Sequence, residues 1–403
     1  MALSPTYYDF VRKLRSFVAD LAEQDAAELL ARPLPPATIH SIDDYDSRFA
    51  QCIDQVDMGI LAHAAKTTGV SVELLKPHLA AALPQARAKF ASLYATVNHE
   101  YHCLVNFALA GKKTFHFSDN LAEHLANTEI NLKAALIQLP FPTCLFTFTS
   151  RAVINAMHNI RGDAGRWAMN ATGLDYSAPV SVFLTVHPAG AGLPDRKLLI
   201  CAWHVRLPDT SYLMLKRELY LGNDWTLEQA LRTDWETLTP NDLGIGLRVN
   251  VDDDAIAHQD DDTFYNDGLA FYRIVLNAVL YLSSNQAELT AMESQRREIE
   301  ARAKELASPP KRRKLLQTTG RYTALDYQEV GASVGPIVIQ KGEADGSTGN
   351  AGGGKPLVRF MVRGHWRRQP HGQESQERKL IWIRPYYKGS DIAATINKPY
   401  LVK

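Results

Sequence analysis

Two apolar runs, Val180-Ser-Val-Phe-Leu-Thr-Val186 and Lys197-Leu-Leu-Ile-Cys-Ala-Trp-His-Val205, decide the fold of this chain. Both are rich in the β-branched and aromatic residues that favour strands. Because a segment rich in glycine and proline separates them, we expect the two strands to pair antiparallel. Ser211-Tyr-Leu-Met-Leu-Lys-Arg-Glu-Leu219 predicts a third strand beside them.

The elements around these three strands mix helix and sheet. Strands are expected at 114–117 and 144–149, and helices at 118–137, 225–235 and 263–283. Ser118 is a suitable N-cap, because its hydroxyl oxygen can accept a hydrogen bond from a free N–H of the first turn. Residues 112–290 are therefore predicted to form a mixed α+β domain on a small antiparallel sheet.

The first 110 residues are predicted to form an all-helical unit. Apolar residues recur there at intervals of three and four, and prolines mark the helix ends. The expected helices cover 4–31, 42–66, 71–83 and 84–110. This unit contains no polar cluster that suggests chemistry.

The net charge of zero conceals an acidic body and a basic C-terminal part. From Arg296 to the end the chain has 21 Lys and Arg against 10 Asp and Glu, a net charge of +11. The first 295 residues therefore carry −11. The basic part is expected either to meet an anionic partner or to dock on the acidic body.

Residues 291–355 are predicted to form a charged helix and a linker. The helix is expected over 292–307, and Ser308-Pro-Pro-Lys-Arg-Arg-Lys314 is expected to be a solvated linker. Its four basic residues also resemble a nuclear-import or RNA-contact patch. The glycine-rich stretch Lys341–Lys355 is nearly devoid of apolar residues, so we expect it to be mobile.

Residues 356–403 contain the most function-bearing part of the sequence, a basic and aromatic β-hairpin. Its strands are expected at 356–362 and 380–384, beside Arg-Gly-His-Trp-Arg (363–367) and Trp-Ile-Arg-Pro-Tyr-Tyr (382–387). Guanidinium groups bind phosphates or carboxylates in bidentate fashion, and aromatic rings stack on bases or peptides. The candidate binding residues are Arg363, Gly364, His365, Trp366, Arg367, Arg368, Trp382, Arg384, Pro385 and Tyr386.

Three interpretations of this hairpin stay open. It is a nucleic-acid surface, a peptide-binding edge, or a structural hairpin that buries its tryptophans in the body. A ribonuclease site is a weaker alternative, with His365 or His371 as the general base near Glu374 and Glu377. We predict no catalytic residues.

Other motifs favour ordinary structure over chemistry. The acidic runs at 252–254 and 260–262 lack the glycine and distal glutamate of a calcium loop, and the four cysteines form no zinc pattern. We therefore predict neither a metal site nor a cofactor. No signal peptide is apparent, and the most apolar helix is too short to cross a bilayer, so a cytoplasmic protein is expected.

The order of several motifs resembles a family of phage- and plasmid-borne type V-A anti-CRISPR inhibitors over residues 112–390. These motifs are Phe115-His-Phe-Ser-Asp119, Leu139-Pro-Phe-Pro-Thr-Cys-Leu-Phe146, the helix over 269–289, and Arg363-Gly-His-Trp366 with Trp382 and Pro385. The chain departs from the family by its additional N-terminal helical unit and its glycine-rich insertion.

The resemblance implies a binding protein that is not an enzyme. It implies recognition of the N-terminal part of a type V-A CRISPR effector nuclease during translation, which lowers the nuclease's messenger RNA. The expected partner is thus a protein or nascent peptide, with RNA or the ribosome as a further partner and no membrane. The alternative is a ribonuclease or a plain RNA- or DNA-binding protein of a phage or plasmid.

Overall fold

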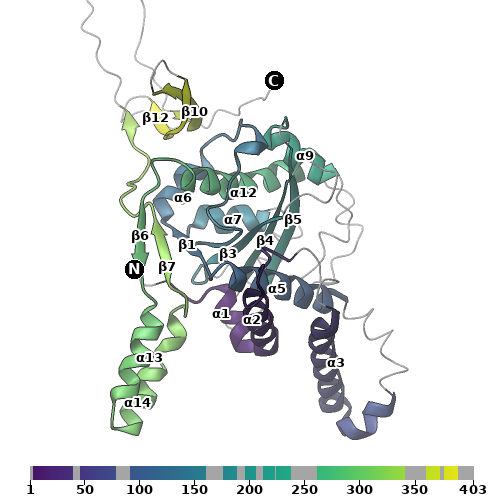
Figure 1. Ribbon diagram of the computed structural model, residues 1–403. Coiled ribbons are helices and arrows are strands. Elements are labelled where there is room, and N and C mark those ends of the chain that lie inside the picture. The colour runs from purple at the N-terminus through teal and green to yellow at the C-terminus, as the bar shows by residue number, and fades with distance from the viewer. Residues whose placement is uncertain are drawn as a thin grey trace, which may run out of the picture.

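A computed structural model describes most of the chain (Figure 1). The described residues are 3–39, 46–78, 91–159, 176–187, 196–205, 212–222, 224–236, 261–340, 360–372 and 376–388. The fold is α+β, as the sequence predicts. The glycine-rich stretch at 341–355 and the acidic run at 252–254 lie outside the described residues.

A seven-stranded sheet forms the centre of the molecule. Its strand order is β5-β4-β3-β2-β1-β7-β6. The strands are β1 (Thr114–Phe117), β2 (Thr143–Phe148), β3 (Val180–His187), β4 (Arg196–Val205), β5 (Tyr212–Leu221), β6 (Leu289–Met292) and β7 (Tyr327–Val330). The antiparallel pairing of β3, β4 and β5 confirms the prediction from their sequences. The sheet is larger than expected and mixed, because β1 pairs parallel with both β2 and β7.

Both faces of the central strands β2, β3 and β4 are buried, which explains why these strands are apolar along most of their length. Along β2, Cys144 and Phe146 belong to one core cluster, whereas Leu145 between them belongs to the other. Along β3, Phe183 likewise points to the opposite side from Val182. Such two-sided burial removes the alternation of polar and apolar residues that marks a half-exposed strand.

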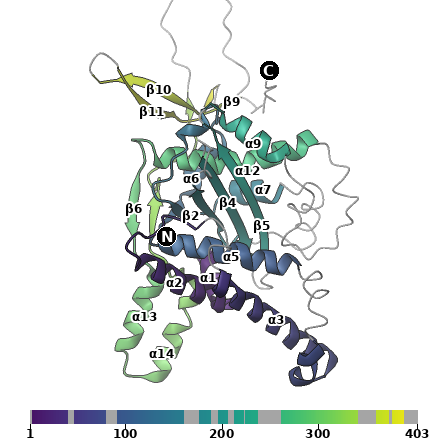
Figure 2. The same ribbon diagram turned by 45° about the vertical axis from the view of Figure 1, so that its right-hand side comes forward.

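Four helices cover one face of the sheet and the N-terminal helices cover the other (Figures 1 and 2). The first group is α6 (Asp119–Ala126), α7 (Arg151–Asn159), α9 (Leu227–Glu236) and α12 (Asp261–Leu282), with the short η2 (Ala134–Leu136) nearby. The N-terminal helices are α1 (Tyr7–Leu14), α2 (Ser16–Leu30), α3 (Asp46–Thr68) and α5 (Ala91–Leu109). None of the helices in the described part of the chain is long and apolar enough to cross a membrane.

Two predicted helices end or break earlier than the sequence pattern suggests. The helix expected over 4–31 is divided at Arg15, whose backbone leaves the helical region while its Nε donates to Glu100 Oε2 at 2.7 Å. The helix expected over 118–137 begins as predicted, with the Ser118 hydroxyl accepting from Leu121 N–H. It ends at Ala126, because the following residues pair with the C-terminal part of the chain.

An arm of two helices projects from the ends of β6 and β7 (Figures 1 and 2). It consists of α13 (Gln295–Glu305) and α14 (Pro309–Leu316), followed by η3 (Thr319–Arg321). The prediction of a solvated linker at 308–314 is wrong, since most of these residues lie in α14. Pro309 and Pro310 occupy the first helical positions, where a missing N–H costs no hydrogen bond.

The C-terminal strands form two small sheets. β10 (His365–His371) pairs with β11 (Glu377–Ile383), whereas β9 (Phe360–Val362) lies with β12 (Tyr386–Lys388) and β8 (Ile339–Gln340). The predicted partnership of 356–362 with 380–384 is therefore wrong. The segments that do pair, 365–371 with 377–383, are closer to each other in the sequence, and closing a shorter loop loses less entropy.

Candidate binding site

The C-terminal hairpin is attached to the body at Gly364, immediately before β10. The Gly364 N–H donates to Asn127 O and the Glu129 N–H donates to Gly364 O, both at 2.9 Å. These two bonds form an isolated parallel bridge between Gly364 and Thr128. The segment after α6 is thus fixed by a partner more than 200 residues away in the sequence.

Gly364 is required here by space. A Cβ at this position would lie 2.6 Å from Thr128 Oγ1 and 2.8 Å from both Ile383 O and Pro385 Cδ. Real Cβ atoms do not approach other heavy atoms so closely, and one of the three contacts is backbone. The absence of a side chain at Gly364 therefore allows a close contact within the protein itself.

Two tryptophans anchor the hairpin in the core. Trp366 is 8% exposed and Trp382 is 2% exposed, and their rings stack at 6.1 Å between centroids. Trp366 Nε1 donates to Asn277 Oδ1 at 2.8 Å, and Trp382 Nε1 donates to Thr128 Oγ1 at 3.1 Å. Burying an indole requires a partner for its N–H, and both rings have one.

Asn277 is the buried polar residue that organises this contact. It lies within the apolar helix α12 and is fully buried. Its Nδ2 donates to Leu125 O at 3.0 Å and to Thr128 O at 2.8 Å, which leaves Oδ1 to accept from Trp366. The Asn277 side chain therefore donates to free carbonyl groups at the C-terminal end of α6 and just after it. It also provides the acceptor for the indole N–H of Trp366.

The second tryptophan is enclosed by three further side chains. Trp382 makes edge-to-face contacts with Tyr281 at 5.4 Å and with His124 at 5.9 Å between centroids. Burial lowers the pKa of His124, so the neutral ring donates from Nε2 to Gly335 O at 3.1 Å. The guanidinium carbon of Arg384 lies 5.6 Å from the centre of the Trp382 ring, within cation–π range.

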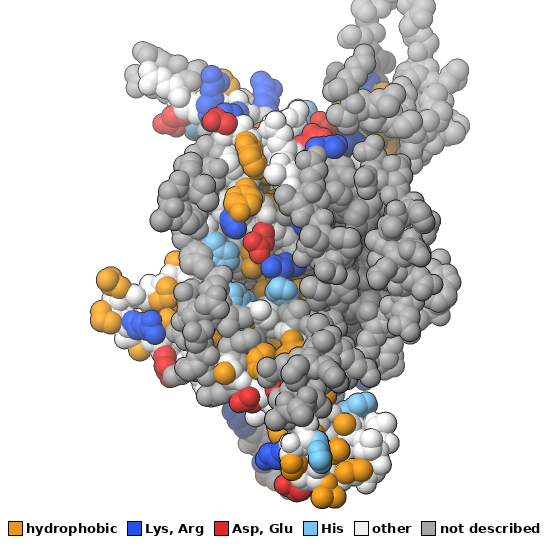
Figure 3. Space-filling view, turned by 90° about the vertical axis from the view of Figure 1, so that its right-hand side faces the viewer, with side chains coloured by type: hydrophobic (Ala, Val, Ile, Leu, Met, Phe, Trp, Pro, Cys, Tyr) orange, Lys and Arg blue, Asp and Glu red, His pale blue; other side chains and the backbone are white. Residues whose placement is uncertain are grey.

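Beyond the anchor, the hairpin is exposed and basic. Cross-strand pairs share a face, so Arg368 and Leu380 continue the face of the two tryptophans, and Pro370 and Arg378 follow them. The opposite face carries Arg367. In the space-filling view, Lys and Arg side chains gather at the end of the molecule where this hairpin lies (Figure 3).

Among the described residues, the outer edge of β11 has hydrogen-bond partners at its base, near Trp382. Trp382 N–H donates to Gln286 Oε1 at 2.6 Å, and Gln286 Nε2 donates to Trp382 O at 3.4 Å. Backbone groups alternate in direction along a strand, so Leu380 and Arg378 also point their N–H and C=O away from β10. Neither has a backbone partner on that side within the described part of the chain.

The region with this geometry matches a known family. The model of the AcrVA2-like family, described as anti-CRISPR type V subtype A2, matches residues 115–387. This is about two-thirds of the chain, from β1 to β12. The chain belongs to the anti-CRISPR type V subtype A2 family. No curated protein matches the chain.

Within this anti-CRISPR fold, the predicted site residues divide into a buried and an exposed group. Gly364, Trp366, Trp382 and Pro385 are buried. His365, Arg367, Arg368 and Arg384 are exposed, and Arg363 and Tyr386 are half-buried. The residues that resemble the family motif therefore include the anchor, and the arginines beside it face solvent.

The histidines proposed for a ribonuclease do not converge. His365 and His371 lie at opposite ends of β10, roughly 20 Å apart at the usual rise per residue of a strand. His371 Nε2 lies 3.1 Å from Glu377 Oε2 across the hairpin. Glu374 lies outside the described residues. Among the described residues, no three or more His, Cys, Asp and Glu side chains are grouped to hold a metal ion.

The sequence did not indicate which residues of the body hold the two tryptophans of the hairpin. Thr128, Asn277 and Gln286 are ordinary residues in their local context. One signal was present, because an asparagine within the most apolar helix of the chain needs a buried partner. The sequence could not name that partner, which lies 89 residues away.

Proposed function

We propose that this anti-CRISPR family member binds the N-terminal part of a type V-A CRISPR effector nuclease while it is being translated, and thereby lowers the level of its messenger RNA. Family membership supports a CRISPR effector as the target. The open outer edge of β11 supports recognition of an extended peptide.

The β11 edge carries the proposal of how the peptide is bound. An extended chain gains main-chain hydrogen bonds when it adds to an unpaired strand. Gln286 already bonds to this edge at Trp382 as a neighbouring strand would, so an incoming peptide would continue the pairing at Leu380 and Arg378. Pro370 at the matching position of β10 cannot donate, which disfavours addition there.

Side chains beside this edge would set the preference for the peptide. Arg378 and Arg384 are exposed, on β11 and just after it, and the half-buried Lys379 lies between them in the sequence. Their positive charge favours a peptide with acidic residues at alternate positions, since successive side chains of a strand point to opposite faces. The half-buried Ile381 and Ile383 offer apolar contacts on the face opposite Trp382.

The test uses bacterial cells that produce a type V-A effector nuclease with or without this protein. We expect the effector mRNA to fall when the protein is present. Synonymous recoding of the first codons keeps the peptide, so the mRNA should still fall. Two compensating frameshifts keep nearly all nucleotides but change the peptide, so the mRNA should be spared. The reverse pattern would contradict peptide recognition.

A ribonuclease is tested separately. Pure protein incubated with labelled effector mRNA, with and without magnesium, should leave the RNA intact. Cleavage in the absence of ribosomes would support the ribonuclease alternative and would refute a mechanism that depends on the nascent peptide.

A further inference from the structure

The arm formed by α13 and α14 carries a concentration of positive charge. From Gln295 to Arg321 there are nine Lys and Arg residues and three Glu residues, a net charge of +6. Four consecutive basic residues, Lys311-Arg-Arg-Lys314, lie within α14, and all four are exposed. Successive residues of a helix are about 100° apart, so these side chains surround most of it.

The arm is fixed at its base and free toward its tip. Arg296 Nη1 lies 3.8 Å from Asp9 Oδ1 of α1, and Arg297 forms an ion pair with Asp326. Toward the tip, no carboxylate of the described part of the chain forms an ion pair with the exposed basic side chains. These side chains are Arg302, Lys304, Lys311, Arg313 and Lys314. Two views place the arm at the opposite end of the molecule from β10 and β12 (Figures 1 and 2).

Part of this positive charge is unfavourable for α14 itself. Lys311 and Arg312 stand in the first turn of α14, where the helix dipole favours negative charge. Lys311 and Lys314 are three residues apart, a spacing at which like charges repel. Since the described part of the body provides no ion pair for these charges, we infer that an external polyanion is their partner.

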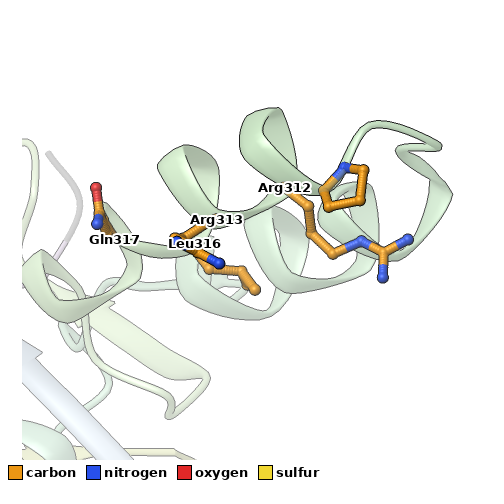
Figure 4. Close-up of a pocket in the computed structure, with 5 residues that line it drawn as sticks. Arg312, Arg313, Leu316 and Gln317 are labelled. Atoms are coloured by element: carbon orange, nitrogen blue, oxygen red, sulfur yellow. The ribbon is translucent and has the colours of Figure 1, made fainter.

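A shallow hollow on α14 combines charge with apolar surface. It is lined by Pro309, Arg312, Arg313, Leu316 and Gln317 (Figure 4). Guanidinium groups bind phosphate oxygens in bidentate fashion, and the proline ring and leucine methyl groups offer a surface for a ribose or base. A membrane surface would require a broad apolar face of large residues, whereas α14 exposes only Leu316, at 40%, among its large hydrophobic side chains.

We propose that the α13–α14 arm is an RNA-binding surface that contacts the phosphate backbone through Lys311, Arg312, Arg313 and Lys314. The choice of RNA over other polyanions rests on the proposed function, which places the protein beside a translated message. The binding itself does not depend on a nuclease or a nascent chain. Pre-formed helices with proline at the first turn lose little entropy on binding.

The experiment measures binding of the full-length protein to a fluorescent single-stranded RNA of about 20 nucleotides by anisotropy. Four phosphate contacts on single-stranded RNA predict an affinity loss of roughly 50-fold between 50 and 200 mM salt. The triple variant K311Q/R313Q/K314Q should bind at least tenfold more weakly at 50 mM salt, with a visibly shallower salt dependence. The substituted side chains are exposed, so its thermal unfolding should match that of the parent.

A matched control changes the same number of charges elsewhere. K13Q/R32Q/K66Q replaces three exposed basic residues of the N-terminal part and should keep the parent's RNA affinity. K311R/K314R should also keep it. The proposal is overturned if the arm and control variants bind alike, or if polyglutamate or the corresponding DNA binds more tightly than RNA. If the arm variant no longer binds RNA but still lowers the effector mRNA in cells, the arm has no role in the proposed function. Peptide recognition would be unaffected by that result.

Discussion

Gly364→Ala is the smallest change that tests the attachment of the hairpin. The added Cβ would lie 2.6 Å from Thr128 Oγ1 and 2.8 Å from Ile383 O and Pro385 Cδ. The hydroxyl cannot rotate away freely, because Thr128 Oγ1 donates to His124 O at 2.8 Å and accepts from Trp382 Nε1. The backbone at Gly364 must therefore move away from the body.

The magnitude follows from two contributions. Overpacking of a filled site costs about 1–3 kcal/mol. The movement also stretches the bonds from Gly364 N–H to Asn127 O and from Glu129 N–H to Gly364 O. Each such bond contributes about 0.5–1.5 kcal/mol, so complete loss of both would roughly double the cost.

Hydrogen exchange followed by mass spectrometry measures this effect locally. If the hairpin opens independently of the sheet, a cost of about 1–3 kcal/mol accelerates exchange in peptides covering Glu129 and β11 by roughly 5- to 150-fold. Peptides from β3 and β4 should be unchanged. Gly320→Ala is the control, because a Cβ there meets nothing within 4 Å. Equal exchange in Gly364→Ala and the parent would refute the close approach.

Three further substitutions test the buried polar contacts. Trp366→Phe keeps the aromatic ring but leaves Asn277 Oδ1 without its donor, which should lower the unfolding free energy in urea by about 1–3 kcal/mol. Arg15→Met leaves the buried carboxylate of Glu100 without its cation and should cost about 3–5 kcal/mol in the same measurement. Burial, with a smaller effect of Lys216, lowers the pKa of His99 to about 4. The unfolded chain takes up this proton near pH 6.5, so stability present above that pH falls as the pH drops toward 4, and His99→Gln should flatten the decline of the melting temperature over this range.

The central strands could be predicted because their signals are local. β3, β4 and β5 are long apolar runs that follow one another, and each pairs with its neighbour in the sequence. β6 and β7 were not predicted. They are four residues each, and Phe115 of β1 pairs with Gln328 of β7 across more than 200 residues. The residue pattern within a four-residue strand does not indicate a pairing partner that is so far away in the sequence.

The sequence indicated the C-terminal hairpin as a candidate site, but it did not indicate which of the hairpin's residues are buried and which are exposed. Tryptophan and arginine are typical both of structural anchors and of binding surfaces. Trp366 is buried because Asn277 and the end of α6 provide a place for it. Arg367, the next residue, points to the opposite face and is exposed. The difference depends on tertiary contacts and not on local composition.

Two separate surfaces emerge from this arrangement. The anchored hairpin lies at one end of the molecule and the basic arm projects at the other (Figure 1), and part of the outer edge of β11 has no backbone partner among the described residues. A nascent peptide and the RNA that encodes it are close together only during translation. Binding both at once would raise the effective concentration of the second contact without any additional interface.

The most direct test of peptide recognition is capture of ribosome–nascent-chain complexes that display the N-terminal part of the effector nuclease. Leu380→Pro removes the outward N–H of β11, whereas Leu380→Ile keeps it with a similar apolar volume. We predict that Leu380→Pro captures at least tenfold less of the complex than the parent, while Leu380→Ile captures as much. Hydrogen exchange of the anchor peptides should be alike in both variants. Equal capture by the two variants with an intact anchor would contradict strand addition at β11.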